Sequence, residues 1–341
     1  SPAGQANQAE RESDLIENSL PLLASTDHVY YSMTKSLCAV CKQGVDAKII
    51  VRDDKVYFDK YCPEHGHQEC MVASSAQWYF DSLTFLSNCT PPKRVTKQVE
   101  KGCPSDCGAC DSHQQKVYLP VVPITSACNL DCPICYTINK NTEAYQMSAE
   151  EMRGILDHLL EDHDELDIIN FTGGEPTMHA GLLDFMAMCR EAGIRRLTVS
   201  TNGLKLMDES YLRKLAQLDV RVILSFDTFS PETDRKLLGA NTVDRKLKLL
   251  DLLAEHDVTT TLLPAIAAGY NDSEVGGILN LVLSRPNICS LELHTMTFTG
   301  QGGTGFSRSG RITIPDLHQQ IAESTSGKIV GADFVPSPLA H

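Results

Sequence analysis

Three cysteines in one short loop have the spacing that an inorganic cluster requires. Cys128, Cys132 and Cys135 form the pattern C-x-x-x-C-x-x-C. Three thiolates on one loop can bind three irons of a 4Fe-4S cluster and leave the fourth iron open to a small molecule. A zinc site without a visible fourth ligand and reduced core thiols are the alternatives. Zinc sites usually pair their cysteines as C-x-x-C knuckles, so the spacing favours the cluster.

An aromatic residue, Tyr136, directly follows the last of these cysteines. With it, the motif resembles the signature of the radical SAM superfamily, in which the amino and carboxylate groups of S-adenosylmethionine (SAM) chelate the open iron. The resemblance implies a SAM-binding 4Fe-4S cluster on Cys128, Cys132 and Cys135, with Tyr136 beside the cofactor. It also implies reductive cleavage of SAM to a 5'-deoxyadenosyl radical, which abstracts hydrogen from a substrate.

A second group of metal ligands is predicted nearer the N-terminus. Its members share two-residue gaps: Cys38, Cys41, Cys62 and His65. Three thiolates and one imidazole at these spacings suit a closed tetrahedral structural site for zinc, or for iron. A hairpin predicted over residues 48–58 separates the two halves, and His67 is the alternative fourth ligand. The alternative that these thiols bind no metal is less favoured, because so short a module can hardly bury a stabilising core without a bound metal or a disulfide.

A third group precedes the main loop by seventeen residues and repeats its spacing: Cys103, Cys107 and Cys110. It predicts an auxiliary 4Fe-4S cluster, with a structural zinc as the competing interpretation. Cys89, Cys70 and His113 are the candidates for a fourth ligand. Four ligands would make a cluster that carries electrons or braces the fold, whereas an open iron could bind substrate.

Composition limits the class of protein. The 341 residues carry a formal net charge of -14, which argues against a general nucleic-acid surface. No run of about 18 apolar residues and no signal segment occurs, so a cytoplasmic protein is expected. Thirteen cysteines then indicate metal ligation rather than disulfides. Cys189 and Cys289 lie in apolar surroundings and are interpreted as buried small hydrophobic residues.

The rest of the chain alternates strands with helices. The predicted strands are Leu119–Ile124, Leu166–Phe171, Arg196–Ser200, Val220–Ser225, Thr259–Ile266 and Cys289–Phe298. The predicted helices are Ser148–Glu161, Ala180–Ala192, Asp208–Leu218, Pro231–Leu238, Thr242–His256 and Asp272–Leu283. This order predicts an α/β fold, a partial (β/α)6 TIM-like barrel whose ligand sites gather at the C-terminal strand ends.

The second strand ends in Gly173-Gly174-Glu175-Pro176. Glycines permit close approach of a ligand, and an acidic side chain can face a cation. At this place the motif resembles the GGEP element of radical SAM enzymes, whose backbone and acidic side chain receive the methionyl ammonium. Alone, the same four residues would be an ordinary turn.

Later strand ends carry small polar side chains: Thr201, Asn202, Ser225 and Asp227. They are placed to hydrogen-bond a ribose; an ordinary Asn-Gly turn and a helix cap at Asp227 are the alternatives. The resemblance implies contacts with the ribose or the methionyl carboxylate, and an adenine contact at Ile266. The glycine-rich loop 299–305 lacks a phosphate-loop lysine and opens no helix, so it is interpreted as a mobile substrate-side loop.

The order of the three cysteine groups, over residues 38 to about 305, resembles one branch of the superfamily. This branch contains the archaeal tetraether lipid synthases and the methanopterin-modifying radical SAM methylases. It implies attack on an unactivated sp3 carbon, with carbon-carbon bond formation, alkylation or methylation of a lipid or pterin-like substrate. Gln114–Val117 departs from the branch, which usually has a further cysteine there.

The resemblance also implies partners: a low-potential donor such as ferredoxin or flavodoxin, no nucleic acid, and access to a membrane surface if the substrate is a lipid. A peptide-modifying radical SAM enzyme is one alternative. An iron-sulfur electron-transfer or metal-sensing protein is another, although such a protein has no need of Gly173–Pro176.

Five parts are expected along the chain. They are a flexible tail (1–27), a small rubredoxin-like or zinc-ribbon module (28–75), a linker helix with the auxiliary segment (76–116), the barrel (117–310) and the start of a truncated C-terminal region (311–341).

Overall fold

The computed structural model describes residues 27–84, 91, 93–102, 106, 108–113, 117–138, 141–162, 166–308 and 311–335. The chain divides into two compact units, residues 1–80 and 81–341. The predicted tail before Asp27 lies outside the described residues, as do Cys89, Cys103 and Cys107, and the departure at residues 114–116.

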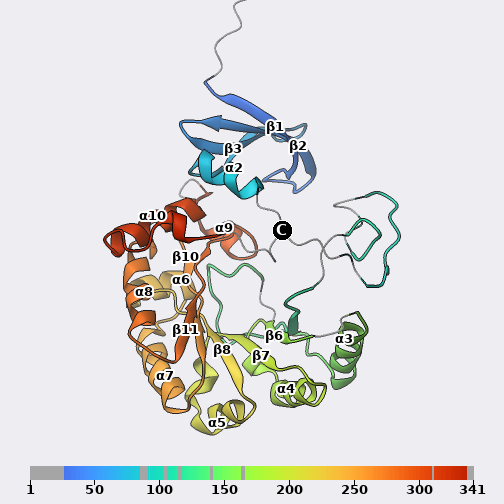
Figure 1. Cartoon of the computed structure of the whole chain (residues 1–341), viewed down its shortest axis with the longest axis vertical. Helices are drawn as coiled ribbons and strands as arrows, with labels where there is room; N and C mark the ends of the chain where they lie inside the picture. The colour runs from blue at the N-terminus through green and yellow to red at the C-terminus, as the bar shows by residue number, and fades with distance from the viewer. Residues whose placement is uncertain are drawn as a thin grey trace, which may run out of the picture. The chain divides into compact units, whose positions relative to one another are not determined.

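The N-terminal unit contains a four-stranded antiparallel sheet in the order β1-β2-β3-β4 (Figure 1). Its strands are β1 (Val29–Leu37), β2 (Gly44–Arg52), β3 (Lys55–Cys62) and β4 (Gly66–Ala73). Asp53 and Asp54 connect β2 to β3 with φ of 51° and 58°, the two positive values that a two-residue hairpin turn needs. The predicted hairpin is therefore confirmed, and β1 and β4 extend it on both sides.

One face of this sheet is covered by helix α2 (Ala76–Thr84). Ile49, Val56 and Ala73 are buried there with Ala76, and the aromatic side chains of the helix pack against them. A small apolar core thus lies between sheet and helix. The ends of the strands near Cys38 and Cys62 form a separate cluster.

The second unit is built on six parallel strands in the order β11-β9-β8-β7-β6-β5. The strands are β5 (Val121–Thr125), β6 (Ile168–Gly173), β7 (Arg196–Thr201), β8 (Val220–Leu224), β9 (Thr260–Leu262) and β11 (Ile288–Leu291). The partial barrel predicted from the sequence is confirmed. The last two predicted strands are each divided, because Pro264 follows β9 and has no N–H for the ladder. Their continuations, β10 (Ala265–Ile266) and β12 (His294–Thr295), pair with each other.

Helices follow the strands along the outside of the sheet (Figure 1). They are α3 (Ala149–Asp162), α4 (Leu182–Glu191), α5 (Glu209–Gln217), α6 (Pro231–Leu238), α7 (Val243–Glu255), α8 (Val275–Leu283), α9 (Gly302–Gly305) and α10 (Ile314–Ser324). Short 3-10 turns are η1 (Pro176–Met178), η2 (Leu204–Met207), η3 (Asp272–Glu274) and η5 (Gly331–Asp333). The capping box of Ser148 and Glu151 is present, with each side chain accepting the other's backbone N–H.

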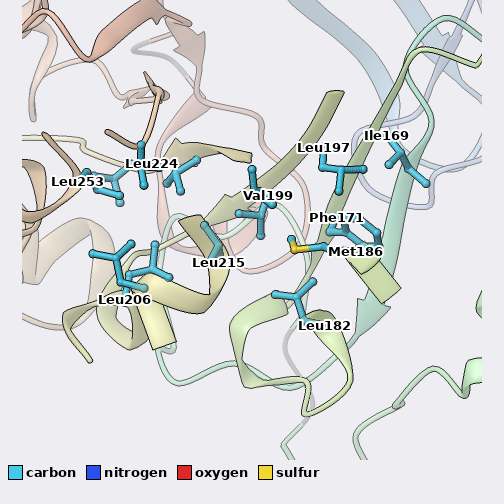
Figure 2. Packing of buried hydrophobic residues seen from close by; sticks show 14 of the residues in the cluster. Ile169, Phe171, Leu182, Met186, Leu197, Val199, Leu206, Leu215, Leu224 and Leu253 are labelled. Carbon is cyan, nitrogen blue, oxygen red and sulfur yellow. The ribbon is translucent and has the colours of Figure 1, made fainter. Parts of the chain in front are cut away.

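Buried aliphatic side chains fill the space between sheet and helices. Figure 2 shows Leu182 and Met186 of α4 beside Phe171 of β6, and Leu215 of α5 beside Val199 of β7. All five side chains are fully buried or nearly so. This packing fixes the positions of the strand ends, where the candidate site lies.

Two further features were not expected. Helix α10 packs Leu317 and Ile321 against Val275 of α8. Cys189 is buried as predicted, but Cys289 is exposed, so that part of the prediction is wrong. Successive residues of a strand face opposite sides, and Ile288 takes the inward position on the edge strand β11.

None of the helices in the described part of the chain has the length and apolar character that a membrane crossing requires.

Candidate active site

The cysteine loop leaves the end of β5 and is anchored at both ends. Asn141 Oδ1 accepts a hydrogen bond from the N–H of Cys128 at 2.9 Å, and Leu237 O accepts one from the N–H of Ile134 at 3.1 Å. The N–H of Leu130 lies 3.4 Å from Cys128 Sγ, and Thr137 Oγ1 lies 3.4 Å from Cys135 Sγ. Three partly buried thiols on one loop, with polar hydrogens beside two of the sulfurs, are a donor set that fits a 4Fe-4S cluster.

Burial makes these thiols hard to ionise. It raises the pKa of the Cys128 thiol, and it raises the pKa of Cys132 to about 12, with the neighbouring Cys128 and Cys135 adding to the shift. Iron binding must therefore displace protons from this loop.

The glycine-rich loop 299–305 holds the cysteine loop from the other side. Gly302 donates its N–H to Cys135 O at 2.9 Å, and Gln301 donates its amide to Asp131 Oδ1 at 2.9 Å and to Cys132 O at 3.1 Å. A Cβ on Gly300 would lie 2.4 Å from the carbonyl carbon of Tyr136. One expectation is corrected: the loop does form a helix, the short α9. Its glycines also permit close packing on the cysteine loop.

The second strand end packs directly against the entrance of the cysteine loop. Gly174 donates its N–H to Thr125 O, and Glu175 donates its N–H to Ala127 O, both at 2.7 Å. A Cβ on either Gly173 or Gly174 would lie 2.3 Å from one of these backbone oxygens. The glycines are therefore required for the contact between β6 and the loop, whatever ligand they also approach.

Glu175 is buried, and protein groups surround its carboxylate. Its Oε1 accepts hydrogen bonds from Thr177 N at 3.1 Å and from the hydroxyls of Thr177 and Thr201, each at 2.6 Å. Its Oε2 accepts the N–H of Asn202 at 2.7 Å. Burial raises the pKa of Glu175 although these donors oppose the shift. The side chain thus joins the ends of β6 and β7, and Oε2 retains capacity for one further donor.

The two polar residues after β7 differ in exposure. Thr201 is buried and donates to Glu175, whereas Asn202 is partly exposed and donates its amide to Asn129 Oδ1 at 2.7 Å. Asn202 therefore connects this strand end to the cysteine loop. Asn202 Oδ1 also accepts the N–H of Leu204, as an Asn-Gly turn predicts.

After β8, the chain turns inward. Ser225 donates its N–H to Thr201 O at 3.1 Å, and Asp227 is buried, with Oδ1 accepting the N–H of Ala265 at 2.8 Å. The alternative that Asp227 caps the next helix is wrong, because Ser230 is the N-cap of α6. Burial raises the pKa of Asp227, and the nearby Lys246 acts against that shift.

The two remaining predicted cofactor contacts, Ile266 and Tyr136, differ in how exposed their side chains are. Ile266 is fully buried in an apolar cluster with Val275 and Ile312. Tyr136 is 61% exposed, so its ring is open to a ligand. Asn271 belongs to the stretch 269–272, whose resemblance to a family element implies a place beside adenine; its side chain is buried and bonds the backbone of Asp227, Ala265 and Ala267, holding β10 against the end of β8.

The N-terminal unit contains a second candidate site, for a single ion. The ligand atoms of its four side chains all lie within 4.8 Å of one another: Cys38, Cys41, Cys62 and His65. His67 faces away from this group and pairs with Asp59. Gln68, which the sequence did not single out, donates its amide to Cys38 Sγ at 3.1 Å.

The polar hydrogens around Cys38 favour its thiolate. Burial alone would raise its pKa, but the Gln68 amide and the backbone N–H groups of Cys41 and Val40 outweigh that effect and lower the pKa to about 6. A thiolate with a second-sphere donor is the form that zinc binds. The four side chains fit a closed tetrahedral metal site.

The auxiliary group is described only in part. Cys110 is buried, and its N–H donates to Gly108 O at 3.0 Å. Asp106 Oδ2 accepts the N–H groups of Glu100 and Gly102, each at 2.9 Å. Cys103 and Cys107 lie outside the described residues, so the auxiliary cluster stays a prediction.

Comparison with known proteins agrees with this geometry. Residues 122–282 match the family described as the Radical SAM superfamily, and residues 30–74 match the HMPTM N-terminal zinc ribbon domain. A partial barrel with a three-cysteine loop at its C-terminal face defines a radical SAM enzyme. Residues 122–282 thus form a Radical SAM domain, and proteins of this superfamily use a 4Fe-4S cluster and SAM.

Named relatives match different shares of the chain. The 7,8-dihydro-6-hydroxymethylpterin dimethyltransferase of Methanocaldococcus jannaschii is 32% identical over 89% of this chain and 61% of that protein. A probable GTP 3',8-cyclase of Saccharolobus islandicus is 28% identical over 51% of this chain and 56% of that protein. The chain thus spans less than two thirds of either relative.

A solved structure is similar in fold. Streptococcus suis SuiB bound to S-adenosylmethionine superposes with a TM-score of 0.52 at 18% identity, covering 61% of this chain and 47% of that one. This similarity supports the fold.

Proposed function

We propose that this chain cleaves SAM reductively to methionine and a 5'-deoxyadenosyl radical, and that the radical initiates alkylation of a pterin-like substrate. The observation that carries the proposal is the 32% identity to a pterin dimethyltransferase over 89% of the chain. That match extends beyond the 161 residues of the barrel family to the zinc-ribbon unit.

The sequence left a lipid and a pterin as alternative substrates. The pterin relative, which matches 89% of this chain against 51% for the cyclase relative, favours the second. Methylation or another carbon-carbon bond formation at a saturated carbon of a reduced pterin is the reaction class that follows from this choice. A low-potential ferredoxin or flavodoxin is the proposed source of electrons.

The residues take distinct parts in this proposal. Cys128, Cys132 and Cys135 hold the cluster, which when bound supplies the electron for the reductive cleavage of SAM. The exposed ring of Tyr136 borders the SAM site. Glu175 accepts the backbone N–H of Asn202, and the side-chain amide of Asn202 donates to Asn129 Oδ1 of the cysteine loop at 2.7 Å, which fixes that loop. The glycine-rich loop shields the backbone of Cys135 from water. In the other unit, Cys38, Cys41, Cys62 and His65 hold zinc as a structural ion.

Anaerobic assays test the proposal. Reconstituted enzyme, dithionite and SAM are expected to yield 5'-deoxyadenosine, and a Cys132→Ala variant is expected to yield none, because two thiolates cannot retain the cluster. When 7,8-dihydro-6-hydroxymethylpterin deuterated at its saturated carbon is added, deuterium is expected in the 5'-deoxyadenosine by mass spectrometry, because the radical takes its hydrogen from that carbon. Absence of 5'-deoxyadenosine from cluster-loaded enzyme would refute the class of reaction. Turnover of a lipid extract, with no change in the pterin, would refute the substrate.

A further inference from the structure

A lysine is buried beneath the mouth of the barrel. Lys246 lies in the first half of α7, and its side chain is 2% exposed. Within the part of the chain that the structure describes, its Nζ has no hydrogen-bond partner. Lysine is among the residues that are almost never fully buried unless they are paired.

The nearest acidic group does not fully satisfy this ammonium. Asp227 Oδ2 lies 3.9 Å from Lys246 Nζ, which is an ion-pair distance but too long for a hydrogen bond. Asp227 is itself only 4% exposed, and its other oxygen accepts the N–H of Ala265. The next buried carboxylate, Asp234, already accepts two hydrogen bonds from Thr242. A buried cation with three donors and one distant partner requires more negative charge nearby than these side chains supply.

That further charge can come from the cysteine loop. Asp227 accepts the N–H of Ala265, and Ala265 packs against the same apolar cluster as Cys132. Leu237 of that cluster accepts the N–H of Ile134 from the cysteine loop at 3.1 Å. The Lys246–Asp227 pair is therefore close enough to the proposed cluster ligands to interact with them through a poorly screened interior. The end of α6 also lies against the loop, because a Cβ on its C-cap Gly239 would lie 3.2 Å from Asp131 O, and Asp234 of α6 bonds Thr242, the N-cap of the helix that carries Lys246.

We propose that the buried Lys246–Asp227 pair sets the reduction potential of the cluster held by Cys128, Cys132 and Cys135, with Lys246 favouring the reduced state and Asp227 opposing it. The inference rests on the proposed function. Addition of one electron makes the cluster more negative, so a fixed cation nearby stabilises the reduced form more than the oxidised form. Neither residue needs to touch SAM for this effect, and both are positioning residues for the electron transfer.

The experiment is a redox titration of reconstituted full-length protein without SAM, with dithionite as reductant and the electron paramagnetic resonance signal of the reduced cluster as readout. In Lys246→Met we expect the ratio of reduced to oxidised cluster at a fixed applied potential to fall about tenfold, which equals a downward shift of about 59 mV for one electron. Lys246→Arg is expected to restore most of the ratio. Lys248→Met is the matched control, since Lys248 is exposed on the same helix.

A second variant is expected to shift the reduction potential in the opposite direction. Asp227→Asn removes the negative member of the pair, so the ratio must rise rather than fall. This variant also decides the question if Lys246→Met does not fold. Iron and sulfide content per chain and the far-ultraviolet circular dichroism spectrum show that the compared proteins hold the same cluster.

Three outcomes would overturn the inference. Unchanged potentials in both variants, or shifts of the same sign, would exclude the charge effect. Weaker SAM binding in Lys246→Met with an unshifted SAM-free potential would make Lys246 a ligand-binding group instead. A wild-type protein that holds no cluster would refute the proposed function together with this inference, whereas unshifted potentials in an enzyme that cleaves SAM refute this inference alone.

Discussion

Replacement of Glu175 by Gln tests whether this carboxylate holds two strand ends together. The side chain is 1% exposed and accepts four hydrogen bonds, three at Oε1 and one at Oε2. The Gln amide can keep its oxygen where Oε1 lies, but its NH2 group then faces the N–H of Asn202. Two donors pointing at each other leave one buried N–H unsatisfied, at a cost of about 2 kcal/mol.

This loss is measurable. It corresponds to a fall in Tm of about 4–8 °C for a unit of this size. Glu175→Ala removes all four acceptor contacts and is expected to cost about 4 kcal/mol. Glu209→Gln, an exposed change in the first turn of α5, is the matched control and is expected to leave the unfolding free energy within about 0.5 kcal/mol of wild type.

The assay combines thermal unfolding with calorimetric measurement of SAM binding to the cluster-loaded enzyme. If Glu175 positions the Asn202 amide, the Gln variant loses stability and SAM affinity together. A direct bond from the methionyl ammonium to Oε2 would instead weaken SAM binding with little loss of stability. Wild-type stability and wild-type affinity in Glu175→Gln would refute both roles.

Three other predictions concern separate parts of the molecule. Gly300→Ala places a Cβ 2.4 Å from the Tyr136 backbone at a φ of 55°, so we expect reduced iron content and less 5'-deoxyadenosine, while Gly305→Ala, with open space, behaves as wild type. Cys38→Ser is expected to release about one zinc per chain, by a colorimetric chelator assay, and to lower Tm more than it lowers SAM cleavage per folded enzyme. Cys289→Ser, at an exposed cysteine of the other unit, is the control, and intact folding with lost chemistry would contradict a structural role. The Ser210 hydroxyl and the N–H groups of Tyr211 and Ser210 lower the pKa of Asp208 below 3.8, so its contribution to stability is present above that pH and lost as pH falls through the lowered value. Asp208→Asn keeps the cap, and urea unfolding between about pH 5 and pH 2 should show a weaker pH dependence than in wild type.

Local patterns predicted most of the fold. The period of apolar residues and the caps of the helices predicted every strand of the six-stranded sheet, and α6 agrees with its prediction to the residue. The spacing of Cys38, Cys41, Cys62 and His65 also predicted which four side chains converge, because a knuckle fixes its own geometry within a few residues.

Long-range packing explains what the patterns did not predict. The contact of loop 299–305 with the cysteine loop joins Gln301 to Asp131, 170 residues away, and no local signal marks it. Lys246 lies in the stretch Lys246-Leu247-Lys248, where alternation with an exposed lysine gives no sign that one of the two is buried. Cys289 was misplaced because its apolar neighbours indicate burial without indicating which face of the edge strand is covered.

The barrel and its cysteine loop do not by themselves identify the substrate. Relatives named as a pterin dimethyltransferase and as a probable GTP cyclase both match this chain, so similarity of fold does not by itself identify the substrate. The match to the dimethyltransferase also includes the zinc ribbon over residues 30–74. If Cys38→Ser protein is stabilised by added osmolyte and still cleaves SAM but no longer alkylates pterin, then the zinc-ribbon unit contributes to substrate recognition. Retention of both activities in the stabilised variant would show that this unit serves stability alone.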